Sequence, residues 1–108
     1  MTSGSFSQSA TPAEVNVVRN TVTKVLVPIL KSVTPGSGTY MNEADVREDD
    51  WQQSFFGSHY PRLLGLKDEL DPERIFWVKT AVGSENWYVQ DDNGLPEVGT
   101  GRLCRRSI

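Results

Sequence analysis

Apolar residues recur every three or four positions between Pro12 and Val33, which is the spacing of one helical face. They are Val15, Val18, Val22, Val25, Leu26, Ile29, Leu30 and Val33. The start of the helix is signalled by Thr11 as N-cap, Pro12 at the first helical position and Glu14 three residues after the cap. The pattern predicts a long amphipathic helix that packs by one side against a sheet or another helix.

Two features interrupt or end this helix. Pro28 removes a backbone hydrogen bond and crowds the carbonyl group four residues earlier, so we expect a kink or a restart between Lys24 and Pro28. The run from Thr34 to Gly38 combines a proline with two glycines and is typical of a turn that follows a helix.

A short strand is predicted from Thr39 to Asn42. Side chains alternate between the two faces of an extended strand, so Tyr40 and Asn42 would point to one face. Met41 and Glu43 would point to the other. An aromatic ring and a carboxamide would thus be presented side by side.

A pair of helices is predicted next, from Trp51 to Phe56 and from Tyr60 to Leu70, with a break at Gly57. The acidic run before them supplies Asp49 or Asp50 as a cap for the first helix. Ser58 is the expected cap of the second.

The last third of the chain has weaker signals. Asp71-Pro72 should end the second helix of the pair, and Ile75 to Val78 is short and apolar enough for a buried extended strand or anchor. Ala81 to Val89 favours a surface loop with one edge strand. Asp92-Asn93-Gly94 is a turn signal, and Arg102 to Ile108 is typical of a basic, fraying tail.

Composition and charge narrow the functional classes. The chain has 108 residues, enough for one domain at most, and 37% of them are hydrophobic, as in globular proteins. A net charge of −3 provides no positive field for nucleic acid. The polar residues 1–11 read as a flexible leader without a secretory signal, and no run is long enough to span a membrane. The single cysteine, Cys104, indicates no redox compartment.

An ordered series of residues between Tyr40 and Trp87 carries a resemblance to a known family. The series is Tyr40-Met41-Asn42-Glu43-Ala44-Asp45, Asp50-Trp51-Gln52, Phe56-Gly57, Tyr60-Pro61-Arg62-Leu63-Leu64, Lys67, Asp71-Pro72, Phe76-Trp77 and Ala81-Val82-Gly83-Ser84-Glu85-Asn86-Trp87. It resembles the C-terminal segment of the berberine bridge enzyme-like family, and more closely its fungal members, which are flavin-linked oxidases with the vanillyl-alcohol-oxidase-type fold. The match covers about half of the chain.

The resemblance implies FAD-dependent oxidation of an alcohol-, amine- or carbohydrate-like small molecule in a full-length protein. It also implies that Asn42 would hydrogen-bond the edge of the flavin ring and that Tyr40 would border the pocket. Many relatives carry a catalytic tyrosine directly after that asparagine, where this chain has Glu43. A carboxylate can act as a general base, so Glu43 and Tyr40 are the catalytic candidates. The alternative for Glu43 is a solvated acid in a loop.

Other candidates have simpler explanations. His59 has no partner at metal-ligand spacing, and the acids from Glu43 to Asp50 are better read as a cap and a solvated face than as a metal or hydrolase site. No metal site is therefore predicted. The aromatic residues are better read as packing than as a stacking platform, because no basic groove accompanies them. The three tail arginines are better read as solvated than as a nucleic-acid patch.

We therefore predict an α+β partial domain with a long amphipathic helix, a short strand, a helix pair and an extended tail. Residues 1–11 would be a leader, 12–35 the end of a substrate domain, 36–89 the family segment and 90–108 a tail. The family's cofactor domain has no counterpart here, and the lone Gly-X-Gly pairs are not phosphate loops. The segment would thus be inactive alone. The alternative is a truncated, non-enzymatic product or a module that binds a partner through exposed apolar surface.

Overall fold

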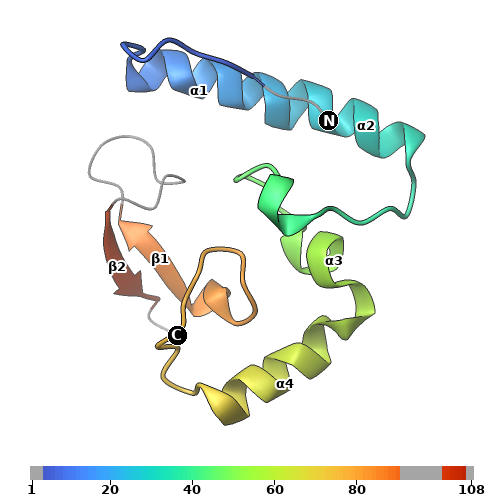
Figure 1. The fold of residues 1–108 in the computed structure, drawn as a ribbon, viewed down its shortest axis with the longest axis vertical. Coiled ribbons are helices and arrows are strands. Elements are labelled where there is room, and N and C mark those ends of the chain that lie inside the picture. The colour runs from blue at the N-terminus through green and yellow to red at the C-terminus, as the bar shows by residue number, and fades with distance from the viewer. Residues whose placement is uncertain (1–3, 91–100, 107–108) are drawn as a thin grey trace.

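The computed structural model describes residues 4–90 and 101–106. Its helices are α1 (Pro12–Thr21), α2 (Val27–Val33), α3 (Trp51–Phe56) and α4 (Tyr60–Leu70), and its strands are β1 (Trp87–Gln90) and β2 (Arg102–Arg105). Figure 1 shows α1 and α2 as one continuous rod, with the remaining elements in a second group below it. The predicted α+β partial domain is confirmed.

Helix α1 begins where the sequence predicts. The Thr11 side chain accepts a hydrogen bond from the Glu14 amide at 3.3 Å, and the Glu14 carboxylate accepts one from the Thr11 amide at 2.8 Å. This reciprocal pair satisfies two backbone donors that the first turn leaves unpaired. The backbone hydrogen bond from Thr11 also holds the pKa of Glu14 below its ordinary value.

A π-helical turn, Val22–Leu26, joins α1 to α2. The amide of Val27 donates to the carbonyl of Val22, five residues back. Pro28 explains the π-helical turn. It has no amide hydrogen to donate to the Lys24 carbonyl, and in a regular α-helix its ring would clash with that carbonyl. The predicted interruption between Lys24 and Pro28 is confirmed, as a widened turn within a continuous helix.

The apolar face of this helix is covered only near its start. Val15 is 6% exposed, whereas Ile29 is 58% and Val33 is 69% exposed. Residues 4–11 run back along α1, and a Cβ atom added at Gly4 would come within 2.5 Å of the Val18 side chain. Most of residues 4–11 are exposed to solvent, and the flexible leader expected over residues 1–11 stays a prediction.

The predicted helix pair is confirmed, and both helices begin and end at the predicted residues. Gly57 adopts the left-handed region, with φ of 55°, and its amide closes α3 by donating to the Gln53 carbonyl. Asp50 stands at the N-cap of α3 without a side-chain cap hydrogen bond. Ser58 is not the cap of α4, because it lies inside the 3₁₀ turn Gly57–His59 that carries the chain directly into that helix.

Helix α4 ends at Leu70, with Asp71 as its C-cap, as the Asp-Pro pair predicts. Of the two expectations for Ile75 to Val78, a buried extended strand or an anchor, the buried strand is wrong, since Ile75 is 78% and Phe76 is 80% exposed. The reason is that the amides of both residues donate to the Asp71 carboxylate, at 2.8 and 3.1 Å, and so are not available to a neighbouring strand.

Asp71 also pairs with Lys67, one turn earlier on α4, and the Lys67 hydrogen bond is the main reason that the pKa of Asp71 lies below its ordinary value. A carboxylate whose pKa is lowered by folding stabilises the fold above about pH 4. That contribution is lost as the pH falls through the folded-state pKa.

We therefore expect Asp71→Asn to lower the thermal midpoint at pH 7, since an amide can neither pair with Lys67 nor accept from both amides. The wild type should lose this advantage over the variant as the pH falls below about 4. Thermal melts of both proteins between pH 2 and 7 test this, with Glu73→Gln, an exposed neighbour, as control. A constant difference across that range would contradict the assignment.

Strands β1 and β2 form an antiparallel ribbon in which Trp87 is opposite Arg105 and Val89 is opposite Leu103. The edge strand expected within Ala81 to Val89 is thus confirmed, with Gln90 added. The prediction of a fraying tail from Arg102 is wrong for Arg102–Arg105, because these residues form strand hydrogen bonds with β1. The predicted turn Asp92-Asn93-Gly94 lies outside the described residues.

The molecule is open for its size. Its radius of gyration is 15.5 Å, against about 13 Å for a compact chain of this length. Its accessible surface is 7821 Å², whereas a compact monomer of 12.1 kDa exposes about 6,000 Å². Among the described residues, Val15 is the one buried hydrophobic side chain, with 6% of its surface exposed. Much of the apolar surface of these elements is therefore uncovered.

Candidate functional site

The predicted site residues lie on a turn between the helical rod and α3. The amide of Thr39 donates to the Ser54 carbonyl at 2.8 Å, which fixes the start of this turn on α3. Residues Met41–Glu43 then form a 3₁₀ turn, closed by the Glu43 amide on the Tyr40 carbonyl at 3.0 Å. The predicted strand from Thr39 to Asn42 is wrong, because α3 takes the Thr39 amide and the following turn satisfies the next backbone groups locally.

Tyr40 and Asn42 are brought together, as the sequence predicts, although by a turn instead of a strand. The Asn42 Nδ2 donates to the Tyr40 hydroxyl at 2.7 Å, and both side chains are exposed. A carboxamide has two donor hydrogens and one acceptor oxygen. The pair thus presents a polar edge of mixed donor and acceptor character at the molecular surface.

The turn also decides where Glu43 lies. Residues three apart stand on the same side of a 3₁₀ turn, which places Glu43 beside Tyr40 and not on the opposite face. Both residues line a groove of 540 Å³ between this turn and the α1–α2 rod. Strand alternation had directed Glu43 away from the pair.

The opposite wall of the groove is mainly apolar. The rod contributes Val18, Val22, Val27 and Leu30, and the N-terminal segment contributes Phe6, while Arg19, Lys31 and Thr34 add polar groups on the rod side. The groove therefore combines a mainly hydrocarbon wall with a phenol and carboxylates on the side of the turn and the acidic run. Such a lining suits a largely apolar small molecule that carries a polar group at one end.

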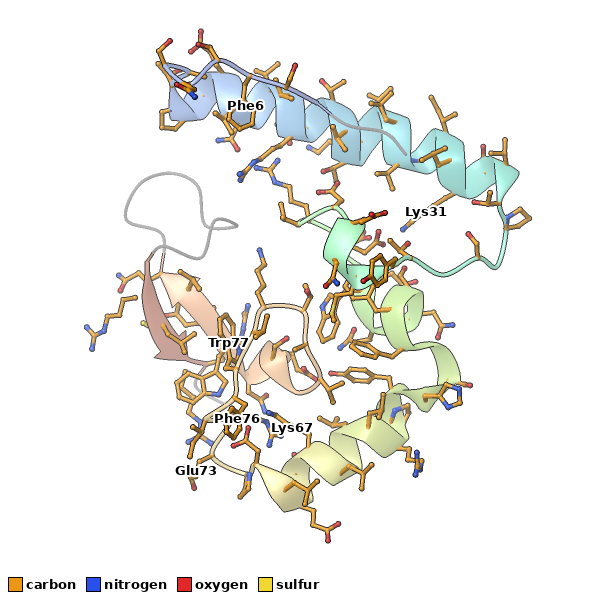
Figure 2. The ribbon with its side chains drawn as sticks, in the orientation of Figure 1. Phe6, Lys31, Lys67, Glu73, Phe76 and Trp77 are labelled. Atoms are coloured by element: carbon orange, nitrogen blue, oxygen red, sulfur yellow. The ribbon has the colours of Figure 1, made fainter. Side chains whose placement is uncertain are left out.

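Three polar links hold the acidic run against the rod. Lys31 donates to Glu48 at 2.5 Å, Thr23 donates to Asp45 at 2.5 Å, and Arg47 donates to Asn16 at 2.6 Å and to Asn20 at 2.9 Å. Figure 2 shows Lys31 reaching from α2 toward this loop. The hydrogen bond to Glu48 is the main reason that the pKa of Lys31 is raised.

The expectation that the acidic run is only a cap and a solvated face is therefore wrong for Glu48. The side chain of Glu48 is 3% exposed and also accepts from the Ser54 hydroxyl at 3.3 Å. Sequence reasoning missed this ion pair, because the partners lie 17 residues apart and only the fold brings them together. The one available signal was a lysine beside the apolar stripe of the helix.

Aromatic side chains pack together around α3 and the start of α4. Trp51 contacts Phe56 and Tyr60 edge-on, with ring centroids 6.3 and 5.5 Å apart. The Tyr60 hydroxyl donates to the Glu85 carboxylate at 2.7 Å and accepts from the Gly83 amide at 3.3 Å. Burial, then the bond to Glu85, raises the pKa of Tyr60. This cluster ties α3 and α4 to the segment that leads into β1.

The remaining candidates do not join the site. His59 is exposed at the start of α4, and Cys104 lies in β2. Within residues 4–90 and 101–106, no three His, Cys, Asp or Glu side chains come close enough together to hold a metal ion. In the same part of the chain, no helix is both long and apolar enough to cross a bilayer.

Comparison with known proteins identifies the segment that contains the turn. Residues 39–83 match the family described as berberine and berberine like. The chain is 48% identical over 102 residues to the FAD-linked oxidoreductase orf1 of Neocamarosporium betae, a match that covers 89% of this chain and 16% of the relative. It is 40% identical over 102 residues to the VAO-type flavoprotein oxidase VAO615 of Thermothelomyces thermophilus, covering 94% of this chain and 16% of the relative.

The chain is also similar to solved structures of VAO-type flavoproteins. The crystal structure of the VAO-type flavoprotein MtVAO615 from Myceliophthora thermophila superimposes with a TM-score of 0.78 at 39% identity, over 96% of this chain and 18% of that one. MtVAO713 from the same organism gives a TM-score of 0.77 at 33% identity, over 90% of this chain and 16% of that one. The chain thus spans about one sixth of the length of the proteins it matches.

Proposed function

The chain is a segment of the berberine bridge enzyme-like family of FAD-linked oxidoreductases, and from this premise we propose that it supplies one wall of a flavin and substrate pocket. The observation that carries the proposal is the match of 96% of this chain to a VAO-type flavoprotein, with a TM-score of 0.78. In that pocket the substrate is an alcohol-, amine- or carbohydrate-like small molecule. The segment alone is inactive.

The turn residues suit the edge of a flavin ring. Asn42 is exposed, and one of its two donor hydrogens is used by Tyr40, so the other hydrogen and the amide oxygen can meet ring donors and acceptors. Bound FAD would supply the acceptor for the electrons of the substrate. No glycine-rich strand–turn–helix unit occurs in the described residues, so the phosphates of FAD would be held by another part of the polypeptide.

Tyr40 and Glu43 would act on the substrate side. Their shared position on the groove places a phenol and a carboxylate beside the apolar wall of the rod. Glu43 is our candidate for the group that accepts the substrate proton, and Tyr40 is our candidate for the group that orients the substrate. Asn42 would position the flavin.

The test uses a chimaera in which this chain replaces the matching segment of VAO615, compared with the isolated 108-residue chain. The isolated chain should be colourless and inactive, and the chimaera should retain a flavin spectrum and oxidise the donor of the parent oxidase. Glu43→Gln in the chimaera should lower kcat at least tenfold with an unchanged flavin spectrum. Asn42→Ala should alter the spectrum or weaken flavin retention. Glu69→Gln, an exposed acid on α4, is the control.

Full turnover in the Glu43→Gln chimaera would remove Glu43 as the base, and a yellow, active isolated chain would remove the claim of inactivity. A second candidate is a non-enzymatic module that binds a partner, which the large exposed apolar surface favours. A chimaera that never acquires flavin, together with dye binding and self-association by the isolated chain, would support that candidate.

A further inference from the structure

The π turn of the rod directs one hydroxyl group toward the acidic run. Thr23 lies in this turn, Val22–Leu26, and donates to Asp45 Oδ2 at 2.5 Å, although the two residues are 22 positions apart. Thr21 and Thr34 instead donate to carbonyl groups four residues earlier, at 3.0 and 2.8 Å, as threonines in helices commonly do. Since π turns occur frequently at functional sites, the contact between Thr23 and Asp45 is a candidate for a functional link.

Asp45 uses both oxygens of its carboxylate. Its Oδ2 accepts from Thr23, and its Oδ1 accepts from the Arg47 amide at 3.0 Å. The Arg47 side chain donates in turn to Asn16 and Asn20 on α1, at 2.6 and 2.9 Å. Residues 16, 20 and 23 are spaced by four and three, so they share one side of the rod. Asp45 is therefore tied to this side of the rod both directly and through Arg47.

Only one residue separates Asp45 from the turn that carries the candidate site. That residue, Ala44, follows the 3₁₀ turn Met41–Glu43, and its amide donates to the Met41 carbonyl at 3.4 Å. Two residues of extended chain span about 7 Å, so fixing Asp45 also restricts where the Glu43 backbone lies. The other end of the turn is bonded to α3, and Figure 1 shows the turn between the rod and α3. The site turn is thus held at both ends.

We propose that Asp45 is a positioning residue, which holds Tyr40 and Glu43 at the groove by joining their turn to the π turn of the rod. The inference rests on the proposed function, in which Glu43 accepts the substrate proton. A displacement of about 1 Å at a reacting group can lower a rate about a hundredfold. Because both oxygens of Asp45 already accept hydrogen bonds, its contribution is made through Glu43.

The first test measures backbone order parameters of the 108-residue chain by NMR relaxation. Asp45→Ala should lower the order parameters of Glu43 and Ala44 from about 0.85, typical of rigid backbone, to about 0.6 or less. Asp45→Asn should retain most of the wild-type value, because a carboxamide can accept from the Arg47 amide and donate to the Thr23 oxygen.

The two threonines provide a matched pair in the same experiment. Thr23→Val removes only the hydroxyl that bonds Asp45 and should loosen Glu43 and Ala44 less than Asp45→Ala does. Thr21→Val removes a hydroxyl that bonds only the rod's own backbone and should leave both amides as in the wild type.

The second test measures turnover in the VAO615 chimaera. Asp45→Ala should lower kcat at least tenfold, with KM for the donor within about twofold and an unchanged flavin spectrum, and Asp45→Asn should restore most of the loss. Asp71→Asn, at the end of α4, also lowers the thermal midpoint but should leave kcat unchanged. This control separates the position of the turn from general stability.

Wild-type order parameters at Glu43 in Asp45→Ala would overturn the inference. So would full turnover of Asp45→Ala in a chimaera that Glu43→Gln impairs, or equal effects of Thr23→Val and Thr21→Val. Should Asp45→Ala fail to fold, Thr23→Val decides in both tests, since it keeps the shape of the side chain. A loosened turn in a chimaera whose turnover neither Asp45→Ala nor Glu43→Gln changes would count against the proposed function alone.

Discussion

Replacing Gly83 with alanine should lower the free energy of unfolding by about 3 kcal/mol. Gly83 has φ of 77°, in the left-handed region, and a Cβ atom there would lie 2.8 Å from Arg74 Nε and 3.3 Å from Lys67 Cγ. Both neighbours belong to the network that holds the segment after α4, so neither can move away without breaking hydrogen bonds. Urea unfolding followed by circular dichroism measures the loss.

Gly65 provides the matched comparison. It lies within α4, and a Cβ atom added there would meet nothing within 4 Å. Because glycine costs a helix interior about 0.8–1 kcal/mol relative to alanine, Gly65→Ala should stabilise the protein by roughly that amount. The same substitution should thus have opposite signs at the two positions. Equal effects would show that the close approach at Gly83 is not as described.

Replacing Lys31 with methionine should cost about 2 kcal/mol. Glu48, its partner, has a side chain that is 3% exposed, whereas that of Lys31 is 48% exposed. Removing the lysine leaves a buried carboxylate with only the Ser54 hydroxyl, and water can compensate for part of the lost pairing because Lys31 is itself half exposed. Lys24→Met, at an exposed position of the same rod, is the control.

The double variant Lys31→Met with Glu48→Gln should recover part of this loss, since no buried charge then remains. The pH dependence gives an independent check. Folding raises the pKa of Lys31 above its ordinary value of 10.5, so its contribution is complete below that pH and is lost as the pH rises through the folded-state pKa. A Lys31→Met variant that stays less stable than the wild type by the same amount through strongly alkaline pH would be evidence against the pairing.

The helices could be predicted from the sequence because their signals are local. The reciprocal bonds of Thr11 and Glu14, the effect of Pro28 and the stop at Asp71 all act within about five residues. Strand β2 could not be predicted, because its residues become a strand only through pairing with β1, about 15 residues earlier.

The sequence placed Tyr40, Asn42 and Glu43 near one another but did not predict their arrangement. Tyr40 and Asn42 come into contact through a 3₁₀ turn and not through the predicted strand. The position of Glu43 depends on the 3₁₀ turn that stands in place of the predicted strand, and the Thr39 amide just before this turn donates to the Ser54 carbonyl of α3. The exposed position of Phe76 was missed because a hydrophobic run predicts burial, whereas burial here requires surface that the described residues do not supply.

The π turn before Pro28 has a geometric consequence for the whole rod. One extra residue in a turn shifts the helical phase of everything after it by about 100°, one residue's rotation. The residues of the rod that line the groove accordingly include Val22 and then Val27, five positions later, followed by Leu30 and Lys31. The later part of the apolar stripe, with Ile29 and Val33, is rotated out of line with Val15. One continuous helix thereby presents two apolar sectors in different directions, one to its own loop and one outward.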